Sequence, residues 1–364
     1  MLILLIFVIA LVLIYMLYMR QAKFGRMPTG ARLELMRQQS NFKDGSFQNQ
    51  NPTPQLTGGA SFYSIMKSFF FEQPKRGKPK DRLPSQKTDL LSLDPGKNVL
   101  VWFGHSSYFI QVDGKRFLVD PVFSGSASPL KFTTRSFPGS DVYSVADIPE
   151  IDYLIVTHDH YDHMDYTTLL QLKTKVKQVI TSLGAGAHLE HWGYDKQHII
   201  EKNWHEELIL TEGFKIITVP ARHFSGRTFK RNQSVWQSFI LTTPTKRLFL
   251  GGDSGYDMHF AQIGNSFGPF DLVILECGQY NKSWRFIHML PPEVVLAAHD
   301  LKAKWLLPVH WGKFALSLHD WDTPVKEVTA IARDKGMPTV TPMIGQELNL
   351  DNITVLSAWW EGLE

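Results

Sequence analysis

Histidines and aspartates cluster directly after an apolar run that ends at Val156. The segment 157–163 reads Thr-His-Asp-His-Tyr-Asp-His. A turn at the end of a strand can direct imidazole and carboxylate groups toward two neighbouring cations, and such ligands suit zinc and other transition metals. This density of ligand-type side chains favours a metal site over scattered surface histidines. The fold must therefore bring further ligands to the end of this strand.

Three further candidate ligands occupy the same kind of position in the chain. Each comes just after an apolar, strand-like run: His223 after 214–219, Asp253 after 247–250 and His310 after 305–309. In α/β architectures the loops at the carboxyl ends of strands converge and build sites. A lone histidine is about as often a buried core residue as a ligand. Taken with the cluster at 157–163, these residues predict one shared site.

The pattern from residue 98 onward alternates short apolar runs with helical stretches. The predicted strands are 99–103, 108–112, 116–119, 151–156, 177–181, 214–219, 236–241, 247–250, 271–275 and 305–309. Asp113-Gly114 predicts a two-residue hairpin, so the first strands should be antiparallel. Helices are predicted at 166–172, 292–302 and 324–335. Strands interleaved with helices need cover on both sheet faces, which favours sheets sandwiched between helical layers.

Residues 1–19 contain no charged residue, glycine or proline. A helix of this length would reach about 28 Å, close to the hydrocarbon thickness of a bilayer. No small-residue cleavage site precedes Arg20, so we predict an uncleaved transmembrane anchor rather than a signal peptide. The basic residues after it predict a body on the cytoplasmic side. They would equally suit contact with anionic lipid.

Charge divides the rest of the chain. Residues 20–97 carry 14 basic and 6 acidic residues, a net charge of +8, whereas residues 98–364 carry 24 and 29, a net charge of −5. This predicts a basic neck over 20–97 and a folded body over 98–364, and the acidic body disfavours a nucleic-acid partner. Within the neck, 61–71 has one apolar helical face, which would pack on the body or lie in a membrane surface. A single cysteine excludes an internal disulfide.

The histidine-rich segment and the downstream ligands resemble the metallo-β-lactamase superfamily of binuclear metal hydrolases, whose fold is an αββα sandwich. The similarity spans roughly 98–350. Within the superfamily, the chain is most similar to the N-acyl phosphatidylethanolamine-hydrolysing phospholipase D branch and its bacterial relatives. The segments that carry this likeness are FQNQNPTP, WFGHSSYFI, LVDPVF, GGDSGY, IHMLPPE and PVHWGKFAL.

The resemblance implies a specific set of ligands for two zinc ions. One zinc would be held by His158, His160 and His223, and the other by Asp162, His163 and His310. Asp253 would bridge both ions, and His288, in the segment HMLPPE, would approach the substrate. The resemblance also favours a homodimer.

Such a zinc pair can activate water and stabilise charge on a phosphodiester or an acyl group. We expect Asp253 to orient the nucleophile, and Tyr161 and His288 to hold a substrate oxygen. Arg227 is a candidate phosphate contact, because a guanidinium can bind two oxygens at once. The alternative is a solvated charged loop. His105 is expected to support the site or the first strands rather than to bind metal.

These features predict a zinc-dependent phospholipase D-type phosphodiesterase that acts on a membrane phospholipid at the bilayer. The leading substrate is N-acyl phosphatidylethanolamine, cleaved to an N-acylethanolamine and phosphatidic acid. One alternative is a hydrolase of the same fold that acts on a soluble lactone, a phosphate ester or RNA. Another is a membrane-anchored scaffold with structural zinc, but seven candidate ligands without cysteine favour open, catalytic positions.

Overall fold

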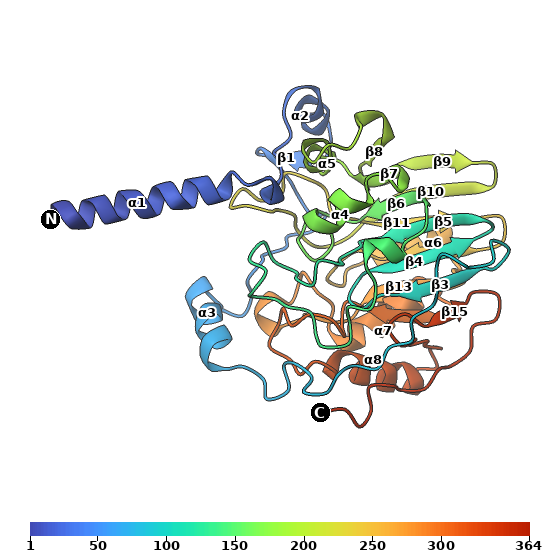
Figure 1. The fold of residues 1–364 in the computed structure, drawn as a ribbon. Coiled ribbons are helices and arrows are strands. Elements are labelled where there is room, and N and C mark those ends of the chain that lie inside the picture. The colour runs from blue at the N-terminus through green and yellow to red at the C-terminus, as the bar shows by residue number, and fades with distance from the viewer.

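The computed structural model describes residues 1–364, except for the side chain of Leu2. Two β-sheets lie face to face in its body (Figure 1). The first sheet has the order β15-β3-β4-β5-β6-β7-β8 and the second the order β14-β13-β12-β11-β10-β9. The first contains β3 (Val99–Trp102), β4 (Tyr108–Val112), β5 (Lys115–Val119), β6 (Ile151–Val156), β7 (Val176–Ser182), β8 (Ile199–Lys202) and β15 (Glu347–Asn349). The second contains β9 (Glu207–Thr211), β10 (Phe214–Pro220), β11 (Gln237–Thr242), β12 (Arg247–Leu250), β13 (Leu272–Glu276) and β14 (Leu306–Val309).

Each sheet is antiparallel in one part and parallel in another. Strands β15, β3, β4 and β5 pair antiparallel, and β5 to β8 pair parallel. In the second sheet β9 to β12 are antiparallel, and β12 to β14 are parallel. Asp113 and Gly114 join β4 to β5 with φ angles of 47° and 75°. Both angles are positive, as a type I′ turn requires, so the predicted hairpin is confirmed.

Helices cover the outer face of both sheets, and this confirms the predicted sandwich. They are α4 (Tyr166–Leu172), α5 (Gly186–His191), α6 (His259–Phe267), α7 (Pro291–Asp300) and α8 (Thr323–Asp334). On β6, Tyr153 and Ile155 point into the core between the sheets, whereas Leu154 and Val156 pack with residues of α4 and α5. Because successive side chains point to opposite faces, a strand that is apolar throughout needs a packed layer on each side.

The neck is partly folded against the body. It contains α2 (Gly30–Arg37), the short pair β1 (Phe42–Lys43) and β2 (Ser46–Phe47), and α3 (Phe62–Phe71). Met36 and Phe47 are buried in a small core with Trp204 and Trp236. Arg32 forms ion pairs of 2.6 Å with Glu190 and Glu201. The predicted helix at 61–71 is confirmed, and it begins with Ser61 capping the Ser64 amide.

The apolar N-terminal segment forms α1 (Leu2–Met19), which extends away from the body (Figure 1). Among the described residues, no helix combines the length and the hydropathy needed to cross a membrane. The predicted helix is therefore present, but the predicted transmembrane span is not supported.

Candidate metal centre

Seven predicted metal ligands meet at one edge of the sandwich. They follow the carboxyl ends of β6, β10, β12 and β14, as the strand pattern predicted: His158, His160, Asp162, His163, His223, Asp253 and His310. Five are almost fully buried, and His160 and Asp162 are partly exposed. Strand β6 belongs to the first sheet and β10, β12 and β14 belong to the second, so the packing of the two sheets brings together residues more than a hundred positions apart in sequence.

One group consists of three histidines whose ring nitrogens face each other. His158 Nε2 lies 2.9 Å and His223 Nε2 lies 3.2 Å from His160 Nδ1. Burial and neighbouring imidazoles hold the pKa of His158 and of His223 well below the usual value. Three neutral imidazoles that turn nitrogens toward one point form a suitable set for a transition-metal cation.

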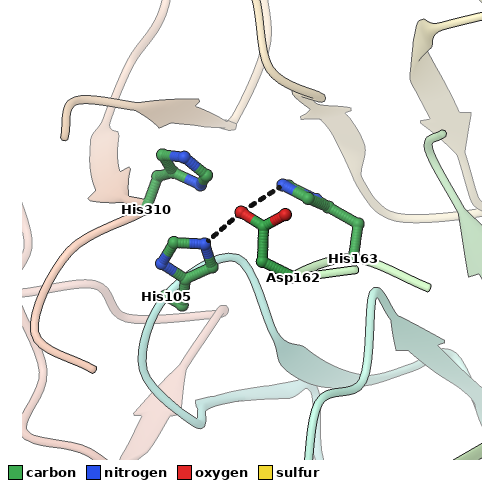
Figure 2. A group of neighbouring side chains, drawn as sticks. All are labelled: His105, Asp162, His163 and His310. Atoms are coloured by element: carbon green, nitrogen blue, oxygen red, sulfur yellow. Dashed lines mark hydrogen bonds and ion pairs between the residues drawn. The ribbon is translucent and has the colours of Figure 1, made fainter. Parts of the chain in front are cut away.

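A second group consists of His105, Asp162, His163 and His310 (Figure 2). Asp162 Oδ2 is 3.5 Å from His163 Nε2 and 2.9 Å from His105 Nε2. His310 joins the same cluster, and the His105 ring lies against it with centroids 4.0 Å apart. His105 is fully buried, contacts the Asp162 carboxylate and belongs to this possible ligand group, so its supporting role stays a prediction.

Asp253 lies between the two groups. Its Oδ2 is 3.1 Å from His163 Nε2 and 3.8 Å from His223 Nε2, and its Oδ1 is 3.3 Å from His310 Nδ1. Burial alone would raise the Asp253 pKa, but the nearby histidines, His163 first, hold it well below the usual value. Oδ1 is buried without a hydrogen-bond partner. Since an orphaned buried carboxylate oxygen is costly, this site fits a bound cation on each side of Asp253.

Outer contacts fix the orientation of the ligand rings. The Nδ1 atom of His158 lies 3.0 Å from Thr157 Oγ1, that of His163 lies 2.7 Å from Asp120 Oδ2, and that of His223 lies 2.8 Å from the Ile287 carbonyl oxygen. These contacts leave Nε2 of each ring for the centre. Asp120 was missed in the sequence, although it also follows a strand, β5, in the segment LVDP.

We expect Asp120→Asn to weaken metal binding by about 10- to 100-fold, because loss of an outer carboxylate releases a ligand ring. Asp120 also accepts hydrogen bonds from the Thr157 amide and hydroxyl. Metal titration followed by mass spectrometry of the native protein would measure the change. Wild-type affinity in a folded variant would show that His163 needs no outer support.

Tyr161 and Arg227 lie outside the metal cluster, in contrast to their predicted roles. The Tyr161 hydroxyl donates to the Arg227 carbonyl at 2.6 Å, and both residues line a separate cavity beside Tyr18 and Lys23. The buried Arg227 guanidinium donates to the carbonyls of Lys23, Asp159 and Met164. It stands 4.1 Å from the Tyr161 ring centre. These contacts give Arg227 a structural role in place of the predicted phosphate contact.

We expect Arg227→Met to lower the free energy of unfolding by about 3 kcal/mol or more, because buried carbonyls each lose a donor at about 1–3 kcal/mol. Arg231→Met is the matched control. Arg231 is exposed and donates to Gln55 at 2.9 Å, so its loss should change stability by about 0.5 kcal/mol or less. Denaturant unfolding of both variants measures this difference, and equal stabilities would contradict the structural role.

A cavity of about 370 Å³ opens over the metal cluster. His160, Asp162, His223, Asp253 and His310 form its floor. Its wall is mainly apolar, and part of it comes from the neck and from α3. Arg231 and the predicted substrate residue His288 also belong to the wall. The residues of the wall are Gln55, Leu56, Phe62, Ile65, Phe224, Arg231, Gln279, Trp284, Ile287, His288 and Leu316. The cavity thus combines a polar floor with a largely apolar wall.

Comparison with known proteins identifies the family. Residues 115–311 match the family described as beta-lactamase superfamily domain. The chain belongs to the metallo-β-lactamase superfamily. A metallo hydrolase from Ignicoccus hospitalis, Igni18, matches in fold with a TM-score of 0.53 and 19% identity, over 69% of this chain and 97% of its own. At this identity the match shows the fold alone.

Sequence relatives extend this similarity over most of the chain. An uncharacterized protein of Mycobacterium tuberculosis is 34% identical over 327 residues, 89% of this chain and 88% of the relative. N-acyl-phosphatidylethanolamine-hydrolyzing phospholipase D 1 of Caenorhabditis elegans is 28% identical over 66% of this chain and 74% of its own length. The mitochondrial protein of the same name from Saccharomyces cerevisiae is 33% identical over 64% and 51%. The metallo-β-lactamase fold and a His/Asp cluster able to bind metal thus mark this chain as a metal-dependent hydrolase.

Proposed function

We propose that the protein is a binuclear zinc phosphodiesterase of phospholipase D type, which releases an N-acylethanolamine or a similar alcohol from a membrane phospholipid. The cavity over the metal cluster carries this proposal. Its floor offers two ligand groups joined by Asp253, and its wall offers apolar side chains that suit an acyl chain. The phospholipase names of the relatives from Caenorhabditis elegans and Saccharomyces cerevisiae support the same substrate.

When bound, two zinc ions would activate water and offset charge on the phosphoryl oxygens. In the overall reaction, water adds to phosphorus, the bond from phosphorus to the headgroup oxygen breaks, and the headgroup leaves as an alcohol after gaining a proton. Asp253, which lies between the two ligand groups, would orient the attacking water. His288 lines the cavity and is placed to contact a phosphoryl or leaving oxygen.

Arg231 is the candidate phosphate contact in this cavity. Its guanidinium lies 4.8 Å from the Phe224 ring centre, and the residue lines the cavity. An arginine can bind two phosphate oxygens at once. We therefore assign to Arg231 the phosphate contact that the sequence suggested for Arg227.

Exposed apolar helices support a lipid surface as the partner. The large side chains of α1 from Ile3 to Leu17 are exposed, and on α3 the exposed fractions of Phe62, Tyr63, Phe70 and Phe71 are 76, 79, 71 and 81%. In Figure 1 both helices stand out on the same side of the view. Apolar surfaces of this extent mark sites of interaction. We place the lipid contact there, with the body on the cytoplasmic face of the membrane.

The test uses the purified, zinc-loaded full chain. It is incubated with phosphatidylcholine vesicles that contain N-palmitoyl phosphatidylethanolamine, and both products are measured by mass spectrometry. We expect N-palmitoylethanolamine and phosphatidic acid in equal amounts, and neither with Asp253→Asn. Hydrolysis of soluble esters without hydrolysis of the lipid would favour the alternative of a soluble-substrate hydrolase.

A further inference from the structure

Glu276 is a buried carboxylate that is neither a candidate metal ligand nor part of the apolar core. It ends β13, between the strands that lead to Asp253 and His310. Its exposed fraction is 1%, and burial raises its pKa to about 7. Oε1 accepts a hydrogen bond from the Met289 amide at 2.8 Å, but Oε2 is buried without a partner. Because an unpartnered buried carboxylate oxygen costs free energy, it suggests a functional requirement.

The neighbour of this carboxylate is His288, the residue expected to face the substrate. Its Nδ1 lies 3.5 Å from Glu276 Oε1, an ion-pair distance rather than a close hydrogen bond. This Nδ1 is also buried without a hydrogen-bond partner. A donor and an acceptor that face each other without closing are typical of sites whose contacts shorten when substrate binds.

The neighbouring rings and Glu276 determine which way the two ring nitrogens of His288 point. Its ring lies beside those of His223 and His310, with centroids 5.0 and 5.3 Å apart, and it lines the cavity over the cluster. The two nitrogens of an imidazole point in different directions, so a ring with Nδ1 directed to Glu276 has Nε2 free for the cavity. The Met289 amide holds the carboxylate in place, next to His288 in the chain.

We propose that Glu276 is a positioning residue that accepts Nδ1–H from His288 and so presents the Nε2 lone pair to the cavity. This inference rests on the proposed function for the role of His288 in the reaction. Glu276 itself does not touch the substrate and acts through the ring. When a carboxylate accepts a hydrogen bond from one ring nitrogen of a histidine, that contact determines which of the two nitrogens carries the proton.

The first test measures the tautomer directly and does not depend on substrate. Side-chain nitrogen-15 NMR of the zinc-loaded full chain reports which ring nitrogen carries the proton, and the His288 signals are assigned by their loss in His288→Ala. We expect the Nδ1–H form in the wild type and a shift toward Nε2–H in Glu276→Gln. An Nε2–H ring in the wild type, or an unchanged ring in Glu276→Gln, would overturn the proposal.

Glu293→Gln is the matched control for this substitution. Glu293 is half-buried, accepts from the Leu290 amide at 2.9 Å and pairs with Arg285 at 2.7 Å, near His288 in sequence. It should leave the His288 tautomer unchanged. The same shift in both variants would mean that the segment 288–293 responds to any loss of charge, and the proposal would fail.

The second test uses the soluble diester bis(p-nitrophenyl) phosphate in a double-mutant cycle. We expect Glu276→Gln to lower kcat by about 10-fold or more in the wild-type background and to have no further effect on His288→Ala. An equal loss in both backgrounds would show that Glu276 acts independently of His288. If the wild type hydrolyses neither this diester nor the lipid, the proposed function fails, while the NMR measurement still decides the role of Glu276.

Discussion

Replacing Asp253 with Asn is expected to lower turnover of the phospholipid by more than about 100-fold while the fold is retained. Changes to outer contacts of metal ligands alone cost about 10- to 100-fold, and Asp253 is itself a candidate ligand shared by two groups. Its Oδ2 faces His163 at 3.1 Å and its Oδ1 faces His310 at 3.3 Å. The amide keeps the size of the side chain but loses the charge that would offset the two proposed cations.

Metal analysis and steady-state kinetics of the same preparation measure this effect. Circular dichroism controls for folding, and Asp257→Asn serves as a matched substitution, since Asp257 contacts Asn51 and Arg222 and is not a member of the ligand groups. Full turnover by Asp253→Asn with a full metal complement would remove Asp253 from the mechanism.

Metal removal is expected to destabilise the folded protein as well as to abolish its activity. The cluster buries histidines and carboxylates that face one another, so without cations these groups lose their partners. A ligand present at about 1,000 times its dissociation constant stabilises a native state by about 4 kcal/mol. We therefore expect the chelated protein to unfold at lower urea concentration, and added zinc to restore both stability and turnover.

The comparison of apo and zinc-loaded unfolding curves includes Asp253→Asn as a control. Its stability should respond less to zinc than that of the wild type. Identical curves for the apo and loaded wild type would argue that these side chains do not bind metal in the folded state.

The metal ligands could be predicted from the sequence because their positions depend on strands. Val156, Leu250 and Val309 end buried strands, and the neighbouring loops hold His158, Asp253 and His310 at one edge. The hairpin at Asp113-Gly114 could also be predicted from the sequence, since it depends only on local backbone geometry. Local rules thus explain the sheets and the cluster.

Contacts between distant segments could not be predicted in this way. The Arg227 guanidinium donates to the carbonyl of Lys23, which lies in the neck more than two hundred residues earlier, and this contact holds it outside the metal cluster. Tyr161 stands among the ligands in sequence, but it lines the separate cavity beside Tyr18 and Lys23. The strands β8, β9 and β15 were missed, because they lie at sheet edges and are less completely apolar than the central strands.

We infer that the seven side chains hold a pair of metal ions with Asp253 between them. Anomalous diffraction from crystals of the zinc-loaded full chain, recorded at the zinc absorption edge, tests it directly. We predict two peaks about 3.5 to 4 Å apart, one beside His158, His160 and His223 and one beside Asp162, His163 and His310. A single peak elsewhere, or no peak in this cavity, would show that these side chains do not hold a pair of metal ions.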